Sequence, residues 1–481
     1  MMSKTKLTIF QINDSHGYLE PHHEVMWNAS KPRSVVLGGY ARIATIFRKA
    51  REENPDAVIA LDNGDTFHGT YPAVKSKGSA LISLLNALLL DAMTGHWDFA
   101  YGPDHLRELT AKLNFPFLAM NSYDKQNGKP AFPSHRIVER AGLKVAVIGI
   151  AALVDKMMPP EFSAGLNFTL GDEELPDLIK KLREFDKVDL IVVLSHLGFP
   201  QDVKLAQKVS DIDILLSGHT HNRLHEPVYM NGSIIIQSGC HGSFVGRLDL
   251  QLEGRKILSC QHQLIAVDES IDPDAEMQAM VETVLAPHRL FLDKVVGSTG
   301  TLLHRNTMLG APMDQFLLCA IAEAADTKIA FSNGWRYGAP IPPGPITIND
   351  LWNIIPTDPP VSTVEMKGEE LFQMIEENLE NVFAADPFKQ IGGYVKRCLG
   401  VNITIKIENP KGHRIQRFFV EGELLDQNRL YKAAFVTSQG VPIKFGIDRV
   451  DLPISAIEAC EQWLGTRPDF SLIEDNTIIA T

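Results

Sequence analysis

Short apolar runs in the first half of the chain repeatedly end in aspartate or histidine. The clearest is Ile212 to Leu216, a strand-like run followed by Ser217-Gly218-His219-Thr220-His221. Four other runs follow the same pattern: Leu7 to Ile12 precedes Asp14 and His16, Val58 to Leu61 precedes Asp62 and Asp65, Leu190 to Leu194 precedes His196, and Ile234 to Ile236 precedes Cys240 and His241. Open α/β sheets place their functional sites beyond the carboxyl ends of the strands. The pattern therefore predicts a mixed carboxylate and imidazole site at such an edge.

This mixture of side chains favours metal binding. Aspartate and histidine together suit Mn²⁺, Zn²⁺ and Fe²⁺. A carboxylate can bridge two ions, and two ions roughly 3.5–4 Å apart can hold an oxyanion and lower the pKa of a bridging water, which is hydrolytic chemistry. One histidine or aspartate after a strand is usually a solvated or turn-forming residue. The prediction therefore depends on several strand ends and on the D-x-H and H-x-H spacings.

Composition narrows the class of protein. The 481 residues predict two or three domains, and a formal net charge of −13 disfavours nucleic acid or an anionic membrane as a partner. The five cysteines are scattered and odd in number, which is typical of reduced thiols. We find neither a signal-peptide pattern nor a membrane-spanning run. We therefore expect a cytoplasmic protein, or a periplasmic or extracellular one if a signal segment has been removed.

The order of elements predicts two domains and a connection. Residues 1–268 alternate strands and helices, which indicates a layered α/β domain. Residues 269–296 read as a polar helical linker containing Pro273 and Pro287. Residues 297–481 mix helices with strand-like alternation, as in an α+β domain. We expect the substrate to bind in a cleft between the two domains, a usual place for small-molecule sites.

Four motifs resemble the ordered metal motifs of the calcineurin-like metallophosphoesterases. They are Asp14-Ser15-His16, Gly64-Asp65, Ser195-His196 and Gly218-His219-Thr220-His221. Together with residues 66–70, Thr-Phe-His-Gly-Thr, and the second domain, they resemble the 5′-nucleotidase family. The resemblance implies a four-layer α/β/β/α sandwich with a dinuclear metal site, followed by a substrate-binding α+β domain.

The resemblance also implies a role for each ligand. Asp14, His16 and His221 would hold one ion, His196 and His219 the other, and Asp65 would bridge them. Two divalent ions are expected, with manganese first and zinc, iron or magnesium as alternatives.

One stretch departs from the family pattern G-N-H-E-x-D-x-G. Here the chain reads Gly95-His96-Trp97-Asp98-Phe99-Ala100-Tyr101-Gly102. His96 stands in place of the metal-binding Asn, Trp97 in place of the transition-state His, and Ala100 in place of its Asp partner. The resemblance therefore implies that the catalytic dyad is missing. We expect His96 either to bind the second metal or to donate to the oxyanion.

The same stretch resembles the G-H-W-E-F-x-x-G pattern of the SoxB thiosulfohydrolase branch. That branch uses two manganese ions and cleaves sulfate from a cysteine S-thiosulfonate on a carrier protein. Residues 331–338 and 386–393 also resemble it, whereas the aromatic pair that holds a base in nucleotidases is not clear. Phe445 could supply one ring, but the usual G-G-D-G-Y context around it is absent. The missing export signal counts against a true thiosulfohydrolase.

Arg336 is the candidate clamp for the substrate oxyanion. Its planar guanidinium suits phosphate or sulfate, and it follows Gly334, where a backbone can approach a ligand closely. Asn333, Arg397 and Phe445 complete the candidate substrate site. A surface or domain-interface salt bridge remains the alternative role for Arg336.

The predicted function is metal-dependent hydrolysis of a phosphate ester, a 5′-nucleotide or a related small anion, with His96 and Arg336 as catalytic candidates. One alternative is SoxB-like hydrolysis of a sulfur ester on a carrier protein. A second is an idle binding protein that has retained its metals. Neither nucleic acid nor a membrane is expected as a partner.

Overall fold

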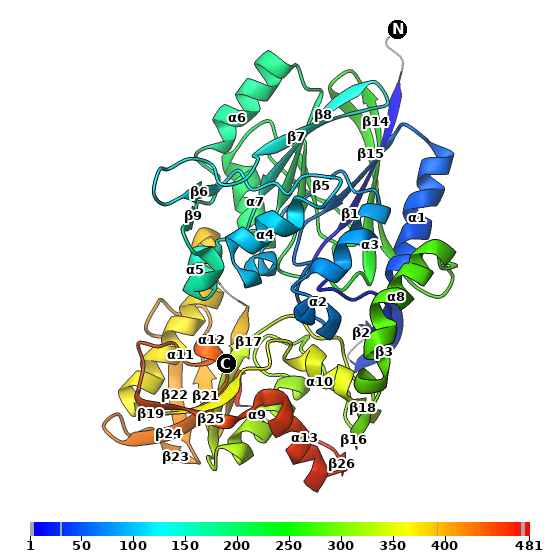
Figure 1. Cartoon of the computed structure of the whole chain (residues 1–481). Coiled ribbons are helices and arrows are strands. Elements are labelled where there is room, and N and C mark those ends of the chain that lie inside the picture. Colours follow the sequence, from blue (N-terminus) through cyan, green and yellow to red (C-terminus); the bar gives the residue numbers. More distant parts are fainter. Residues whose placement is uncertain (1–3, 29–30, 392, 473–476) are drawn as a thin grey trace. The chain divides into compact units, whose positions relative to one another are not determined.

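Figure 1 shows the computed structural model of the chain, which describes residues 4–28, 31–391, 393–472 and 477–481. The chain divides into two compact units: residues 1–22 with 36–287, and residues 23–35 with 288–481. The boundary between residues 287 and 288 falls inside the predicted linker, residues 269–296. Most of that linker is the helix α8 (Ala275–Leu292). Within the described part of the chain, no helix is long and apolar enough to cross a membrane.

The first unit contains two large sheets. One has the strand order β15-β14-β1-β4-β5 and the other the order β12-β13-β11-β10-β8-β7. The strands of the first sheet are β1 (Thr5–Ile12), β4 (Val58–Asp62), β5 (Ala92–Met93), β14 (Phe244–Glu253) and β15 (Lys256–Ala266). Those of the second are β7 (His135–Arg140), β8 (Leu143–Ile150), β10 (Leu190–Ser195), β11 (Ile214–Ser217), β12 (Val228–Met230) and β13 (Ser233–Ile236). β1, β4 and β5 run parallel, as do β8, β10, β11 and β13.

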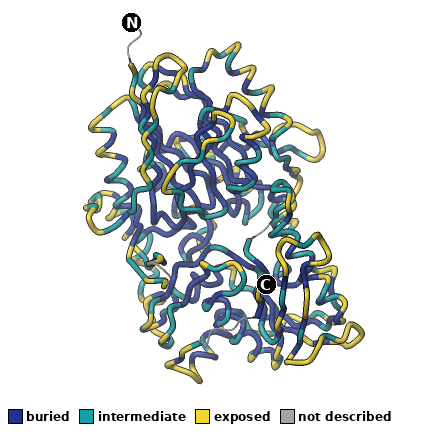
Figure 2. Tube along the Cα trace, turned by 180° about the vertical axis from the view of Figure 1, so that it is seen from behind, coloured by how far each residue is buried: buried dark blue, intermediate teal, exposed yellow. Residues whose placement is uncertain are grey.

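The two sheets share one apolar core. Ile9 and Ile59 of the first sheet cluster with Val192 and Ile214 of the second, and all four are fully or almost fully buried. Strands buried on both faces need continuous apolar runs, which is why these segments do not alternate. α1 (Tyr40–Glu53) packs on β4, and α7 (Phe199–Lys208) packs on β11. Figure 2 shows that buried segments of the chain gather in the interior and that exposed segments lie at the margin. The predicted four-layer sandwich is confirmed.

Smaller elements complete the first unit. They are α2 (Tyr71–Lys75), α3 (Ile82–Ala87), α4 (Pro103–Thr110), α5 (Val154–Met157), α6 (Leu175–Lys181), β6 (Ser122–Asp124) and β9 (Leu166–Phe168). None of the five cysteines, all of which lie in the described part of the chain, is in a disulfide, and three of them are buried.

The second unit is built from several smaller sheets with helices packed on them. Its five-stranded sheet, in the order β20-β17-β24-β19-β25, comprises β17 (Ile329–Gly334), β19 (Pro360–Lys367), β20 (Tyr394–Leu399), β24 (Leu430–Phe435) and β25 (Ile447–Ser455). Its other strands are β16 (Val295–Thr299), β18 (Gly344–Thr347), β21 (Val401–Ile405), β22 (Ile415–Val420), β23 (Glu423–Leu424), β26 (Asp469–Phe470) and β27 (Ile478–Ala480). Its helices are α9 (Pro312–Ala324), α10 (Ile348–Ile354), α11 (Gly368–Phe383), α12 (Thr437–Gly440) and α13 (Ala456–Thr466). This is the expected α+β class.

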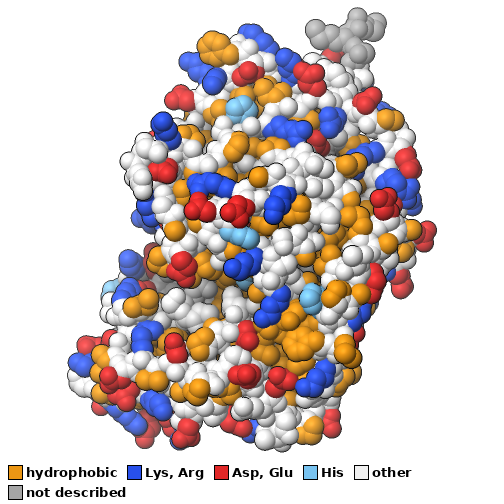
Figure 3. Space-filling view, in the orientation of Figure 1, with side chains coloured by type: hydrophobic (Ala, Val, Ile, Leu, Met, Phe, Trp, Pro, Cys, Tyr) orange, Lys and Arg blue, Asp and Glu red, His pale blue; other side chains and the backbone are white. Residues whose placement is uncertain are grey.

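A hairpin from the start of the chain belongs mainly to the second unit. It consists of β2 (Pro21–Asn28) and β3 (Lys31–Gly38), and residues 23–35 group with residues 288–481. The sequence predicts these residues within the first domain, 1–268, because nothing in the local sequence indicates that they group with another unit. On the face shown in Figure 3, acidic and basic side chains are interspersed.

Candidate metal centre

The seven predicted metal ligands all follow strand ends of the first unit. Asp14 and His16 follow β1, Asp65 follows β4, and His96 follows β5. His196 follows β10, and His219 and His221 follow β11. They form two clusters, one of Asp65, His96, His196 and His219, and one of Asp14, His16 and His221. Within each cluster one potential ligand atom per residue lies within 4.8 Å of the others. The structure thus brings together all seven residues, and metal binding by them remains a prediction.

Asp65 contacts members of both clusters. Its Oδ2 lies 3.3 Å from His196 Nε2, 3.4 Å from His96 Nδ1 and 3.8 Å from His16 Nε2. In the other cluster, Asp14 Oδ1 lies 3.2 Å from His221 Nε2 and also 3.5 Å from His196 Nε2. A carboxylate that shares neighbours from two ligand sets has the placement that a bridging ligand requires.

The ligand loops have an unusual backbone. Five of the seven residues are in the left-handed region, with φ of 52° at Asp14, 49° at His16, 55° at Asp65, 70° at His219 and 58° at His221. Side chains other than glycine rarely adopt this conformation, and it costs of order 1–3 kcal/mol per residue. Backbone hydrogen bonds between loops hold the turns: Asp14 N donates to Gly64 O, and His16 N donates to Asp65 O.

Asp98 fixes the loop that carries Asp65. Its carboxylate accepts hydrogen bonds from the backbone N–H groups of Asp65, Thr66, Phe67 and His96, at 2.8 to 3.1 Å. Burial, followed by the nearby Asp65 charge, raises the pKa of Asp98. The carboxyl thus connects the turn after β4 to the turn after β5. The sequence shows an acid at this position but not the four donors, which come from two loops.

We expect Asp98→Asn to lower the affinity for Mn²⁺ and kcat by about 10–100-fold each, the usual cost of losing a group that orients metal ligands. The amide has one accepting oxygen and would turn its NH₂ toward backbone donors. Metal analysis after dialysis and steady-state kinetics measure both effects. Asp104→Asn, an exposed position on α4, is the matched control. Equal metal content and kcat in the two variants would contradict this role of Asp98.

Second hydrogen bonds orient the imidazoles. His196 Nδ1 lies 2.6 Å from Asn63 O, so that this nitrogen donates and Nε2 faces the ligand clusters. His16 Nδ1 makes the equivalent contact with His68 O at 3.2 Å. Asp202 accepts hydrogen bonds from Ser195 Oγ and Ser217 Oγ, at 2.6 and 2.5 Å, and so joins the ends of β10 and β11. Burial raises the pKa of Asp202 to about 7, although the two hydroxyl groups oppose it.

The charges of the clusters suit a cation. Burial raises the pKa of the Asp14 carboxyl, but His221 and His196 outweigh it and bring the pKa below its usual value. His96 and His196 similarly outweigh burial at Asp65. Burial lowers the pKa of His16 to about 3, which leaves a neutral imidazole with a lone pair. At His196 burial is overcome by Asp65 and Asp14, which raise its pKa to about 10. A divalent ion could take the place of that proton.

His96 and Trp97 occupy the divergent stretch. His96 is 3% exposed, and its Nε2 has no hydrogen-bond partner among the described residues. The Trp97 indole stacks on the His68 ring, with centroids 4.7 Å apart and planes 23° apart, while its backbone N–H donates to Asp65 Oδ1. A buried imidazole nitrogen without a partner fits a metal ligand. The donor set of two carboxylates and five imidazoles fits Mn²⁺, Zn²⁺ or Fe²⁺ better than Mg²⁺, which prefers oxygen.

The predicted substrate residues lie in the second unit, at β17 and beyond. Asn333 and Arg336 are half-buried, and Arg336 Nη2 donates to Gly393 O at 3.4 Å while its guanidinium lies over the Tyr394 ring. A Cβ at Gly334 would meet Tyr394 O at 2.2 Å. The close approach at Gly334 is therefore to the neighbouring strand β20, and a substrate contact at this glycine stays a prediction.

Arg397 and Phe445 are both buried in the second unit, and their part in substrate binding stays a prediction. Arg397 is 1% exposed, and its Nε pairs with Asp314 Oδ2 at 2.9 Å, so it serves a buried ion pair of the second unit. Phe445 is 4% exposed and belongs to the apolar core of that unit. Local sequence does not reveal either partner, because both contacts are tertiary.

Comparison with known proteins agrees with this structure. Residues 7–223 match the calcineurin-like phosphoesterase family, and residues 295–437 match the 5′-nucleotidase C-terminal domain. The chain is 24% identical to the trifunctional nucleotide phosphoesterase YfkN of Bacillus subtilis, over 86% of this chain and 30% of that protein. It is 25% identical to a 5′-nucleotidase of Vibrio parahaemolyticus, over 84% of this chain and 79% of that protein. The chain thus spans about a third of the length of YfkN.

Two solved structures share the fold. The sulfate thiohydrolase SoxB of Thermus thermophilus, in complex with glycerol, has a TM-score of 0.91 and 24% identity, covering 98% of this chain and 96% of that one. A 5′-nucleotidase precursor from the same species has a TM-score of 0.86 and 22% identity, covering 99% of both chains. The two matched regions and the fold agree, and the chain combines a calcineurin-like phosphoesterase domain, at residues 7–223, with a 5′-nucleotidase C-terminal domain, at residues 295–437.

Proposed function

We propose that the protein is a metal-dependent phosphoric monoester hydrolase that acts on a 5′-nucleotide or a related small phosphate ester. The observation that supports it most is the pair of ligand clusters, because Asp65 of one cluster also lies 3.8 Å from His16 Nε2 of the other. Asp14, His16 and His221 would hold one divalent ion, and His96, His196 and His219 the other. Such ions polarise phosphoryl oxygens and supply a nucleophile from water at neutral pH.

The residues of the chain position this chemistry. Asp98 holds the Asp65 loop, and Asn63 fixes the His196 ring. His96 has one nitrogen near Asp65, and its other nitrogen makes no hydrogen bond to the described residues, so that it serves as a ligand or as a donor to the phosphoryl group. Burial keeps bulk water from the ligands, which strengthens each electrostatic contact.

The nucleotide is proposed from the relatives. A trifunctional nucleotide phosphoesterase and a 5′-nucleotidase align with most of this chain. A small phosphate ester also suits the local positive charge that two ions would bring to a protein of net charge −13.

The deciding experiment is phosphate release from adenosine 5′-monophosphate by protein reconstituted with Mn²⁺, with Asp65→Asn as the blank. Turnover above the blank supports a 5′-nucleotidase. No release from a protein shown by metal analysis to hold two ions would contradict the nucleotide assignment. Hydrolysis of p-nitrophenyl phosphate by the same sample would then retain the phosphoesterase and exclude an idle binding protein.

The divergent stretch provides no evident general acid to protonate the leaving group, so kcat should depend on the leaving group. Trp97 occupies the position where the family carries histidine, and an indole N–H does not protonate an alkoxide at neutral pH. General acid catalysis is worth about 10²–10⁴-fold. We therefore expect kcat for p-nitrophenyl phosphate to exceed that for a simple alkyl phosphate by roughly 10²-fold. Equal kcat values across a series of leaving groups, with chemistry rate-limiting, would show that another residue supplies the proton.

A second candidate follows from the divergent stretch. His96-Trp97 and residues 331–338 resemble the SoxB branch, and SoxB shares the fold. The substrate would then be a sulfur ester on a protein cysteine. Sulfate release from a peptide S-thiosulfonate, in the absence of phosphate release from AMP, would favour this candidate.

A further inference from the structure

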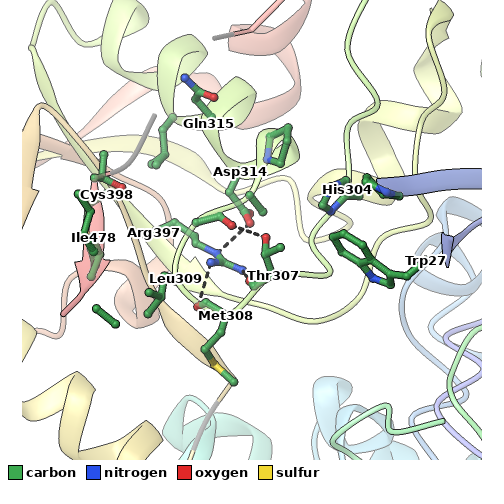
Figure 4. A pocket seen from close by; sticks show the side chains of 18 residues that line it. Trp27, His304, Thr307, Met308, Leu309, Asp314, Gln315, Arg397, Cys398 and Ile478 are labelled. Atoms are coloured by element: carbon green, nitrogen blue, oxygen red, sulfur yellow. Dashed lines mark hydrogen bonds and ion pairs between the residues drawn. The ribbon is translucent and has the colours of Figure 1, made fainter. Parts of the chain in front are cut away.

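A cavity of about 630 Å³ lies within the second unit, apart from the residues of the metal centre. Its lining comes from the β2–β3 hairpin, the segment before α9, the first turns of α9, and strands β20 and β27 (Figure 4). Small-molecule sites usually have volumes of roughly 300–1,000 Å³. The cavity is therefore large enough for an organic ligand.

Three buried charged side chains, Arg305, Asp314 and Arg397, lie together at this cavity. Asp314 Oδ1 accepts from Arg305 Nε at 2.7 Å, and Asp314 Oδ2 lies 2.9 Å from Arg397 Nε. All three residues are at most 2% exposed. Arg397 and Asp314 line the cavity, and Asp314 is the only carboxylate among its described lining residues. Two guanidinium groups and one carboxylate leave one buried positive charge in excess.

The remaining contacts of Arg397 do not neutralise that charge. Its Nη1 and Nη2 donate to the backbone carbonyls of Met308 and Thr307, at 3.2 and 2.8 Å. The described residues thus accept hydrogen bonds from two of its five N–H groups, and Nε lies near Asp314 Oδ2 as an ion pair without a hydrogen bond. His304 also lines the cavity, but burial lowers its pKa, so it adds no charge at neutral pH. A buried charge in excess is costly unless it is paired.

The rest of the lining is largely apolar. Figure 4 shows Arg397 between Leu309 and Ile478 on one side and the rings of Trp27 and His304 on the other. The Trp27 and His304 centroids are 6.3 Å apart at 81°. A ligand that fits must therefore combine one negative charge with a hydrophobic body. A phosphate dianion carries two negative charges, so it would leave one net negative charge in the cavity instead of neutralising the excess positive charge.

We propose that this cavity binds a small organic monoanion, a carboxylate on an aliphatic or aromatic body, with the carboxylate on Arg397 and the body against Leu309, Leu318 and Ile478. The site is independent of the phosphate chemistry at the metal centre.

The test is calorimetric titration of the full chain with cyclohexanecarboxylate and with cyclohexanecarboxamide, which has nearly the same shape but no charge. We expect one carboxylate per chain and an affinity at least about ten-fold above that of the amide, from the charge-assisted contact. Gln315→Trp, at a half-buried lining position on α9, should abolish binding. Glu323→Trp, an exposed position on the same helix outside the lining, should preserve it.

Three results would overturn the proposal: no binding by the wild type, equal affinity for the amide, or unchanged binding by Gln315→Trp. Ala480→Trp, at an exposed lining position, gives the same readout if Gln315→Trp does not fold. Carboxylate binding that is lost in Asp65→Asn but kept in Gln315→Trp would assign the ligand to the metal centre and also overturn the proposal. Phosphate release by the same samples reports on the hydrolase separately.

Discussion

Replacing Asp65 with asparagine should lower kcat for phosphate-ester hydrolysis by roughly three orders of magnitude or more, the scale seen when one member of a catalytic unit is removed. Asp65 is 2% exposed and lies within 3.8 Å of ring nitrogens from both ligand clusters. The amide carries no charge and has one accepting oxygen, so it cannot balance or bridge two cations. We expect the variant to bind fewer than two ions per chain, as measured by metal analysis alongside kcat.

Asp62→Asn is the matched control for this prediction. Asp62 lies three residues earlier, is fully buried, and contacts Gly64 N and Thr66 Oγ1 rather than the clusters. Burial raises its pKa to about 8, so the carboxyl is mostly protonated at neutral pH and asparagine is a close substitute. We expect this variant to keep both ions and most of kcat. Full activity and two ions in Asp65→Asn would contradict the role given to Asp65.

The largest effect on stability is expected at Asp314. Asp314→Asn would leave Arg305 and Arg397 buried without their shared carboxylate. Removing one partner from a buried ion pair costs about 3–5 kcal/mol, because the remaining charge has no compensation. We expect the free energy of unfolding of the second unit to fall by that amount, visible as a lower transition temperature in calorimetry or a lower denaturation midpoint.

A surface pair gives the comparison for Asp314. Lys328 and Glu421 pair at 2.8 Å, but their side chains are 78% and 40% exposed. Exposed pairs contribute about 0–1 kcal/mol, so Lys328→Gln should leave the transition almost unchanged. An Asp314→Asn transition as high as that of Lys328→Gln would show that the second unit compensates the two guanidinium groups in another way.

The candidate metal ligands could be placed at strand ends because residue type and periodicity coincide in the sequence. Each candidate follows a strand, and the parallel strands of each sheet end on the same side. His96 could also be identified as a candidate ligand from the sequence, because it replaces the asparagine of a recognisable motif. The structure adds what residue types do not encode, namely that Asp98 accepts four backbone hydrogen bonds from two loops.

The second unit was harder to predict. Arg397 appeared as a substrate ligand because a guanidinium suits an oxyanion, yet its partner Asp314 lies 83 positions earlier in the chain. Phe445 appeared as a stacking ring, yet it is part of a core assembled from many strands. The β2–β3 hairpin joins residues 23–35 to residues 288–481, a contact between distant parts of the chain. Burial and long-range pairing are tertiary properties, and residue type at one position does not report them.

The left-handed backbone of the ligand loops sets the stability of the chain against its ability to bind metal. Glycine would relax the turn at Asp14, His16, Asp65, His219 or His221, and would thereby gain stability while losing a metal ligand. At these five positions stability and function therefore favour different residues. A protein that had lost its chemistry would be free to drift toward the more stable choice. Aspartate or histidine stands at all five of these strained positions, which is the pattern expected if their side chains serve as metal ligands.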